Sequence, residues 1–424
     1  MNEQQQISRY VSYMYSYPHK TAYRTLTPPV SLSPYLERLE GREASLYFHI
    51  PFCAHKCGYC NLFSQQCCDA ERISLYLHTM RRQAEQLSVA AQGLKFTSVG
   101  GGTPLILDEG QLEELFCLAE LFGVHPSRVF TSVETSPEYT QKSVLRQLRA
   151  RGVERLSMGV QSFNETELKK LKRRPGLGIV VGALENIVEA GFPQFNLDLI
   201  YGIEGQTVES FMRSLNTALT YRPNELFIYP LYVRSGTRIN VRSTDDIGYA
   251  IYKSARELLV GQGFVQTSMR RFVRGETTET EFSCGDEVML SCGAGGRSYL
   301  GNLHYATPYA VRQQAIADEI DHYIRTTDFM TAANGFLLST EEMQIRFIIK
   351  NLMYHRGVDL AEYEKRFGEK PDRNLFRGFT DRGWIEETGR IVRLTEEGMA
   401  YSDYIGQAFI SPVVRKLMSE YVYP

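Results

Sequence analysis

The chain has 424 residues, of which 43% are apolar and 23% charged, and such a composition excludes a disordered protein. The 47 basic and 49 acidic residues nearly balance, which argues against a general nucleic-acid-binding surface. No apolar run reaches the roughly 18–20 residues of a membrane span, and the polar start lacks a signal core, so we expect a cytoplasmic protein. The length predicts two or three domains, or one large barrel with an appendage.

The chain begins with an aromatic and basic arm, which we assign to residues 1–43. Five tyrosines lie between residues 10 and 23, and prolines follow at positions 28, 29 and 34. We expect a short helix or an irregular arm, and then an extended segment at Thr27–Pro29, because a residue before proline avoids the helical region.

From about residue 45, strand-like segments alternate with helical periodicity at intervals of about thirty residues. Strands are predicted at residues 45–50, 95–99, 128–133, 155–160, 195–200 and 225–229. Helices are predicted between them at residues 69–90, 108–122, 137–151, 178–190 and 207–220, the second with Asp108 as its N-cap. Alternating βα units predict a parallel sheet with right-handed crossovers. Six such units fit a doubly wound open sheet or an incomplete barrel, and periodicity alone does not decide between them.

The regular alternation of strand and helix patterns ends after the sixth strand. A helix is expected at residues 244–261, and a stretch rich in glycine and serine follows at residues 284–302. Arg270, Arg271 and Arg274 are expected to form a solvated basic face. Further helices at residues 341–355, 359–367 and 373–383 precede a hairpin at residues 384–394, which indicates a small winged-helix-like domain. We therefore divide the rest of the chain into a barrel, a connecting segment and a C-terminal domain, at residues 44–235, 236–330 and 331–424.

The eight cysteines are unevenly placed, and five of them lie between residues 53 and 68. Cys53, Cys57 and Cys60 follow the first strand with the spacing Cys-x-x-x-Cys-x-x-Cys. In a reducing compartment, such a group indicates a metal site more than disulfide bonds. Cysteine thiolates hold iron–sulfur clusters, and three ligands from one loop leave one iron open to a small molecule.

Two other interpretations of the cysteines remain. Zinc is the competing metal, with His55 or Cys67 as a fourth ligand, although structural zinc sites usually take two pairs of ligands. Three unrelated cysteines on one face of a helix would also show this spacing, but Pro51 before the group and Gly58 within it argue against a helix.

The cysteine pattern resembles that of the radical S-adenosylmethionine (SAM) superfamily. The longer string Leu46-Tyr-Phe-His-Ile-Pro-Phe-Cys-Ala-His-Lys-Cys-Gly-Tyr-Cys60 is similar to the oxygen-independent coproporphyrinogen III oxidase (HemN)-like family. The resemblance implies a [4Fe-4S] cluster on Cys53, Cys57 and Cys60, with SAM chelating the open iron and cleaved to a 5′-deoxyadenosyl radical. It also implies an α/β fold, a partial (β/α)6 barrel with the cluster at the carboxyl ends of the strands.

The resemblance assigns the first SAM contacts to the ends of the second and third strands. Gly101, Gly102 and Thr103 are implied to contact the methionyl amino group, and glycine suits this place because it has no Cβ to block a close approach. Glu134 ends the third strand, where its carboxylate can accept hydrogen bonds from the ribose. The plainer interpretation of Glu134 is an exposed charge at a strand end.

Further contacts are expected after the fourth and fifth strands. Gln161 lies in a string that is similar to the family's, and the guanidinium of Arg173 can pair with the SAM carboxylate. Asp198 should face the barrel mouth, because an unpaired charge inside an apolar strand would be costly; the alternative is a partnership with a basic side chain. Tyr47 matches a family tyrosine near the cluster, and it should share one side of its strand with His49.

Two departures from the oxidase pattern stand out. Leu62 occupies the place of a further cysteine, and Pro175 stands where the family has a histidine, so that Arg174 is an alternative to Arg173. Both departures favour relatives of the oxidase, which include a haem-transfer chaperone and haem-degrading methyltransferases. We expect a radical SAM enzyme with a small-molecule substrate such as a tetrapyrrole, and an electron donor such as flavodoxin or ferredoxin. The alternatives are a methyltransferase on haem or another substrate, and a haem-binding transfer chaperone.

The arm bears on substrate choice. His19, Lys20 and Arg24 lie among the tyrosines and could bind a flat anionic substrate through charge pairing and stacking. The plainer alternative is that the tyrosines pack the arm on the barrel and the charges are solvated.

Overall fold

The computed structural model describes residues 8–12, 14, 16–39, 44–275 and 288–424. Its centre is a sheet whose middle strands are adjacent and parallel. These strands are β2 (Ser45–Ile50), β5 (Phe96–Gly101), β6 (Phe130–Thr135), β7 (Arg155–Gln161), β8 (Gln194–Tyr201) and β9 (Glu225–Pro230). They correspond to the six predicted strands. Tyr13, Tyr15 and Cys284, which the sequence singled out, lie outside the described residues.

The sheet curves but does not close. Beyond β9 it continues with antiparallel β11 (Arg271–Val273) and β10 (Val265–Gln266). On the other side β12 (Met289–Cys292) runs parallel to β2. It is followed in space by antiparallel β13 (Arg297–Leu300), β14 (Leu303–Ala306), β15 (Thr331–Leu337) and β1 (Arg24–Ser31). Within the described residues the edge strands β1 and β10 do not pair, so the expected partial barrel is confirmed.

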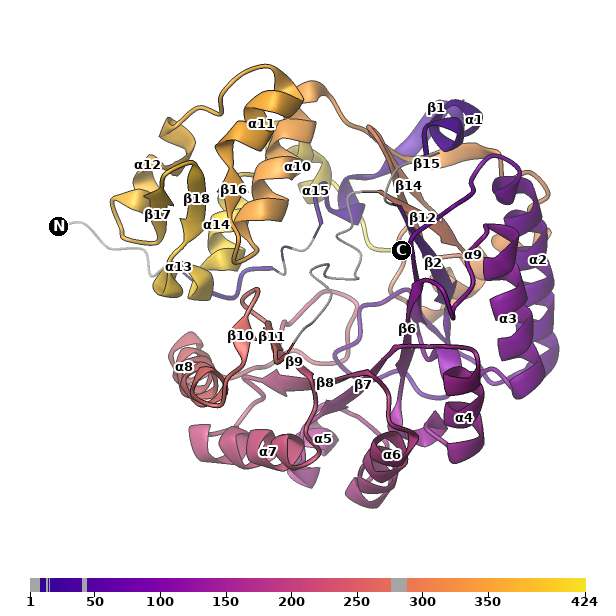
Figure 1. Cartoon of the computed structure of the whole chain (residues 1–424), viewed down its shortest axis with the longest axis horizontal. Helices are drawn as coiled ribbons and strands as arrows, with labels where there is room; N and C mark the ends of the chain where they lie inside the picture. Colours follow the sequence, from indigo (N-terminus) through magenta and orange to yellow (C-terminus); the bar gives the residue numbers. More distant parts are fainter. Residues whose placement is uncertain (1–7, 13, 15, 40–43, 276–287) are drawn as a thin grey trace.

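Helices form the outer layer of this barrel (Figure 1). They are α2 (Ala70–Ser88), α3 (Glu109–Leu121), α4 (Lys142–Ala150), α5 (Glu165–Lys170), α6 (Leu177–Ala190), α7 (Val208–Thr220) and α8 (Asp245–Gly261). Several begin at a side chain that accepts a backbone hydrogen bond in the first turn, and Asp108 forms the predicted cap, as a capping box with Gln111. Short elements connect them: η3 (Pro104–Ile106), η4 (Pro137–Tyr139), β3 (Phe52–Cys53) and β4 (Gln65–Gln66).

One prediction about these elements was wrong, and two strands were not predicted. The helix expected over residues 137–151 is divided into η4 and α4, because the Thr140 hydroxyl bonds the Ser136 carbonyl and Gln141 is extended. The glycine- and serine-rich stretch contains strands β12 and β13. These strands could not be recognised from hydrophobic periodicity, because each has only four residues and glycines separate them.

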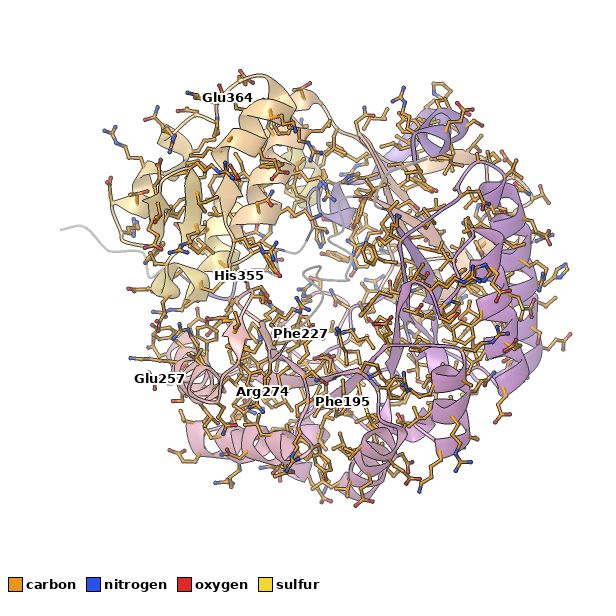
Figure 2. All side chains as sticks on the ribbon, viewed as in Figure 1. Phe195, Phe227, Glu257, Arg274, His355 and Glu364 are labelled. Atoms are coloured by element: carbon orange, nitrogen blue, oxygen red, sulfur yellow. The ribbon has the colours of Figure 1, made fainter. Side chains whose placement is uncertain are left out.

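The C-terminal region packs helices on a small sheet. It contains α10 (Thr340–Leu352), α11 (Leu360–Phe367), α12 (Asn374–Thr380), α13 (Glu396–Ala400), α14 (Ser402–Ala408) and α15 (Pro412–Ser419). The predicted hairpin is present as β17 (Ile385–Thr388) and β18 (Ile391–Leu394), and β16 (Val358–Asp359) joins it. His355, labelled in Figure 2, lies on the side of this region that faces the barrel edge. Its backbone N–H donates to the Thr267 carbonyl at 2.8 Å.

The arm runs between these two parts of the molecule. It contains η1 (Lys20–Ala22), α1 (Ser33–Leu36) and η2 (Glu37–Leu39). Outside the arm, α9 (Gln313–Arg325) lies beside α2. Tyr10, Tyr17 and Tyr23 are buried, as the packing alternative requires. The segment Thr27–Pro29 lies within β1 and is extended as predicted.

The basic group at residues 270–274 is not the solvated face that we expected. Arg270 and Arg271 are 4% and 2% exposed, and each is in an ion pair, Arg270 with Asp403 and Arg271 with Glu225. Arg274 alone is exposed, and its guanidinium donates to the Gln262 carbonyl. The carboxylates that allow this burial lie far away in the chain, so the local charge pattern could not indicate them.

Among the described helices, none is both long enough and apolar enough to cross a membrane.

Candidate active site

A cavity of about 380 Å³ lies at the carboxyl ends of the parallel strands. Strands β5, β6, β7, β8 and β9 contribute residues to its wall, and so do segments that follow β2, β5, β6, β7 and β9. In parallel α/β barrels this is the end where active sites are built. The sequence-predicted residues that line the cavity are Cys53, Cys57, Cys60, Gly101, Gly102, Thr103, Glu134, Gln161, Arg173 and Asp198.

The cysteine loop connects β2 with α2 and is held at both ends. Its start pairs with its end as the short strands β3 and β4. In the middle, the Gly58 N–H donates to the Leu171 carbonyl at 2.9 Å, and a Cβ on Gly58 would lie 3.0 Å from that oxygen. Lys56 is 9% exposed, and its ammonium donates to the carbonyls of Leu62, Ser64 and Val311.

Each cysteine sulfur lies near a hydrogen-bonding group. The Thr103 hydroxyl donates to Cys53 at 3.5 Å, and the Arg173 guanidinium donates to Cys57 at 3.3 Å. The hydroxyl of Ser64 lies 3.8 Å from the Cys60 sulfur. Burial raises the pKa of Cys53 to about 12 and also raises that of Cys60. The buried thiols therefore stay protonated at neutral pH unless a metal displaces the proton.

Glycines line the wall beside the cysteine loop. Gly101 has φ of +115°, and its N–H donates to a carboxylate oxygen of Glu134 at 3.2 Å. A Cβ on Gly102 would lie 2.9 Å from the Cys53 sulfur and 2.5 Å from the Phe52 carbonyl. Only glycine therefore lets the strand end approach the cysteine loop so closely.

Arg173 reaches the cavity from the segment after α5. Its guanidinium donates to the Gly159 carbonyl as well as to Cys57, while its Nε is buried and has no partner among the described residues. A buried donor without a partner is costly, so this atom is available to a bound anion. Gln161 lines the wall next to it with φ of +75°, a conformation that non-glycine residues rarely adopt. Arg174 is exposed and also lines the cavity.

Asp198 lies on the β8 side of the cavity. The Asn196 amide donates to its carboxylate at 2.8 Å and to the Ser157 hydroxyl at 2.7 Å. Burial raises the pKa of Asp198 to about 7, and the Glu134 charge adds to this shift although the Asn196 hydrogen bond opposes it. None of the ion pairs among the described residues involves Asp198, so its polar partner here is an amide rather than a basic side chain.

Tyr47 does not line the cavity. It shares one side of β2 with His49, as predicted, and its hydroxyl lies 3.1 Å from His49 Nδ1. The other ring nitrogen of His49 lies 2.9 Å from the Phe63 carbonyl, and burial lowers the pKa of His49 to about 4. The pair therefore supports the cysteine loop from within the barrel.

The sequence analysis missed one wall of the cavity. Tyr229 lines it from within β9, and Tyr232 and Arg234 line it after that strand. The Arg234 guanidinium lies 5.0 Å from the centre of the Tyr232 ring. The rule that loops after parallel strands form the site would have indicated this segment.

The basic residues of the arm contact the protein itself. Lys20 lies 3.7 Å from the centre of the Tyr309 ring, and Arg24 donates to carbonyls that include that of Leu417. His19 accepts a hydrogen bond from the Thr21 N–H. None of the three lines the cavity that holds the cysteine loop.

Comparisons with known proteins agree with this geometry. The family model of the radical SAM superfamily matches residues 47–218, and that of the HemN C-terminal domain matches residues 338–401. The oxygen-independent coproporphyrinogen III oxidase of Salmonella typhimurium is 30% identical, over 87% of this chain and 86% of that protein. The heme chaperone HemW of Bacillus subtilis is 27% identical, over 86% of this chain and 99% of that protein.

The fold has a close counterpart among solved structures. The structure of coproporphyrinogen III oxidase (HemN) from Escherichia coli superposes with a TM-score of 0.77 at 21% identity, over 94% of this chain and 96% of that chain. An open α/β barrel with a cysteine loop at its strand ends is the fold of radical SAM proteins. Within that class, the chain belongs to the HemN-like family, whose members carry the names of both an oxidase and a heme chaperone. This confirms the predicted family and fold.

Radical SAM proteins bind a [4Fe-4S] cluster and SAM, and the residues of the cavity fit both. No three His, Cys, Asp or Glu side chains converge on a single-ion site in the described part of the chain. A cubane cluster takes each cysteine at a different iron, so three separated thiols suit it better than they suit one zinc ion. The unpartnered Nε of Arg173 and the glycine wall leave polar donors and space for SAM beside the loop.

Proposed function

We propose that this protein is a radical SAM enzyme in which Cys53, Cys57 and Cys60 hold the cluster. When bound, the cluster and SAM supply reductive cleavage of the sulfonium to a 5′-deoxyadenosyl radical that abstracts a substrate hydrogen. The observation that carries the proposal is the convergence on one cavity of three cysteines, a glycine wall and an arginine whose Nε has no partner among the described residues.

The other wall residues would bind and orient SAM. Gly101 and Gly102 allow its amino-acid portion to approach the backbone, and Thr103 donates to the adjacent Cys53. Arg173 would pair its planar guanidinium with the SAM carboxylate. Glu134, Gln161 and Asp198 present the polar atoms that a ribose and an amino group require. Tyr47 would act indirectly, through His49 and the loop at Phe63.

The remaining wall suits a flat anionic substrate. Tyr229 and Tyr232 offer aromatic faces, and Arg234 lies over the Tyr232 ring, where its charge can also meet a carboxylate. A tetrapyrrole with propionate groups has this chemistry. For coproporphyrinogen, removal of a propionate hydrogen would leave a substrate radical, and transfer of one electron from it to an external one-electron acceptor would accompany loss of carbon dioxide and formation of a vinyl group. The separate electron for SAM cleavage would come from a flavodoxin or ferredoxin.

A haem-transfer chaperone is the second candidate. It is favoured by Leu62 at the place of the oxidase's further cysteine, and by the HemW alignment, which extends over 99% of that relative. The same aromatic and cationic wall would then bind haem without turnover. A stoichiometric change of the Soret band on titration with haem supports this candidate, and the absence of saturable binding counts against it.

Substitution of one cysteine tests the proposed site. Cys57→Ala should abolish SAM cleavage, because one iron loses its protein ligand, whereas Cys67→Ala in the same loop should retain it. The measurement is 5′-deoxyadenosine formation by the anaerobically reconstituted proteins with SAM and dithionite, together with their iron and sulfide content. Continued cleavage by Cys57→Ala would refute the assignment.

A product assay separates the reactions. The reconstituted protein is given SAM, a reductant and either coproporphyrinogen III or haem, and the tetrapyrroles are analysed by mass spectrometry. Loss of carbon dioxide and two hydrogens identifies the oxidase, and gain of a methyl group identifies a methyltransferase. Formation of 5′-deoxyadenosine with unchanged tetrapyrroles would place the substrate in another class.

A further inference from the structure

A buried lysine lies inside the cysteine loop, and the roles proposed above do not use it. Lys56 lies between Cys53 and Cys57 in the chain, and only 9% of it is exposed. Its ammonium donates to the carbonyl of Val311 at 2.9 Å, of Ser64 at 3.2 Å and of Leu62 at 3.4 Å. The side chain thus joins the middle of the loop to its return segment and to a segment more than 240 residues away.

These partners satisfy the hydrogen-bonding groups of the ammonium but not its charge. Carbonyls are neutral, and none of the ion pairs of the described residues involves Lys56. Burial of an ammonium without a counter-charge costs several kcal/mol in general, so a protein retains one only where something compensates the charge.

Cysteines flank Lys56 in the chain, and they become anionic when they bind a metal. Lys56 directly precedes Cys57 in the chain and lines the same cavity as Cys53, Cys57 and Cys60. Cluster binding takes these cysteines as thiolates, which are anionic. The charge of Lys56 therefore finds its counter-charge when the loop takes up its metal.

The other cation at the cysteines is placed differently. Arg173 donates to Cys57, and its buried Nε has no partner among the described residues. This Nε is the donor that we propose for SAM. All three of the hydrogen bonds from Lys56 end on carbonyls of the protein. Lys56 is thus bound to the loop and to the carbonyl of Val311 before any ligand enters.

We propose that Lys56 is a positioning residue for the cysteine loop and a fixed charge that raises the reduction potential of the cluster held there. The proposal rests on the cluster site of the proposed function. Reduction of a cluster adds one negative charge, here from an external one-electron donor. A cation within the loop that holds the cluster favours the reduced form, since local charge and hydrogen bonding to the sulfurs set cluster potentials.

Lys56→Met tests both parts of the proposal, because it removes the charge and the three hydrogen bonds together. Its matched control is Lys170→Met. The Lys170 ammonium also donates to a carbonyl, that of Glu204, but Lys170 does not line the cavity. Lys56→Arg retains the charge and serves as the rescue variant. The measurement is a potentiometric titration of each reconstituted protein, followed by the electron paramagnetic resonance signal of the reduced cluster.

We expect the midpoint potential of Lys56→Met to fall below that of the wild type, while Lys170→Met matches the wild type and Lys56→Arg recovers most of the difference. An unchanged potential in Lys56→Met overturns the charge effect. If Lys56→Met takes up no cluster, Lys56→Gln, which retains a hydrogen-bond donor without the charge, replaces it in the titration.

Hydrogen exchange of the apo proteins tests the positioning role without a cluster. The Gln65 and Cys67 N–H groups donate to the carbonyls of Pro51 and Cys53, which closes the loop. These amides should exchange faster in Lys56→Met than in the wild type or Lys170→Met, and equal rates overturn the role. A wild type that binds no iron refutes the proposed function itself, and the exchange comparison still decides the role of Lys56.

Discussion

At the scale of single residues, Asp198 makes the stability of the apo protein depend on pH. Burial raises its pKa to about 7, whereas an aspartate in an unfolded chain titrates near about 3.9. Between these values the folded protein holds a proton that the unfolded chain has released. The free energy of unfolding should therefore decrease as the pH rises from about 4 to 7, and this residue should add no further change above that range.

Asp198→Asn should remove this contribution, because the amide oxygen still accepts the Asn196 hydrogen bond but does not titrate. The measurement is urea unfolding of the apo proteins at pH 5 and pH 8. The wild type should lose more stability between the two pH values than Asp198→Asn, and the exposed Asp381→Asn should behave as the wild type. Equal losses in wild type and Asp198→Asn would contradict the assignment.

At the scale of elements, Glu167 joins three segments at the mouth of the barrel. It is 4% exposed and lies in α5, and its two carboxylate oxygens accept hydrogen bonds from Ser162, Gln206 and Ser210. These partners belong to the end of β7, the loop after β8 and the start of α7. Because α5 also ends just before Arg173, we infer that this network fixes the approach of that arginine to the cavity.

Glu167→Gln should destabilise the protein by about 1–3 kcal/mol, because an amide group would face hydroxyl and amide donors in a buried place. It should also weaken SAM binding through the displacement of Arg173. Urea unfolding and equilibrium dialysis with SAM measure the two effects. The control is Glu165→Gln, an exposed position on the same helix. Destabilisation with unchanged SAM binding would show that α5 does not position Arg173.

At the scale of the whole molecule, a buried ion pair joins the C-terminal region to the cavity wall. Asp403 in α14 is fully buried and accepts hydrogen bonds from Arg270 at 2.6 Å and from the Tyr232 hydroxyl. The Met14 N–H of the arm donates to the same carboxylate at 3.3 Å. Three distant parts of the chain therefore meet behind Tyr232, whose ring lines the cavity.

Asp403→Asn should cost about 3–5 kcal/mol, because it removes the buried carboxylate charge that pairs with the buried Arg270. Trp384, the single tryptophan of the chain, packs on Tyr401 two residues before Asp403 and reports on this region. In Asp403→Asn its fluorescence should change at a lower urea concentration than the far-ultraviolet circular dichroism. The two transitions should coincide in wild type and in Asp381→Asn, and coincidence in Asp403→Asn would refute independent loosening of the region.

Much of the fold and of the candidate site could be predicted from the sequence. The six parallel strands have at least 6 residues, and the longest of their helices has 19, so their hydrophobic patterns can be recognised in the sequence alone. The cysteines, the glycine wall and the strand-end polar residues lie just after such strands. Since the carboxyl ends of parallel strands meet at one edge, residues predicted from separate motifs line one cavity.

Other features depend on contacts between residues far apart in the chain, and only the tertiary structure decided them. Arg270 and Arg271 look like surface charges until Asp403 and Glu225 are placed beside them. The wall at Tyr232 depends on the C-terminal region, and Lys56 depends on the carbonyl of Val311. Local propensity describes how a segment folds, but burial of a charge depends on a partner that the nearby sequence does not contain.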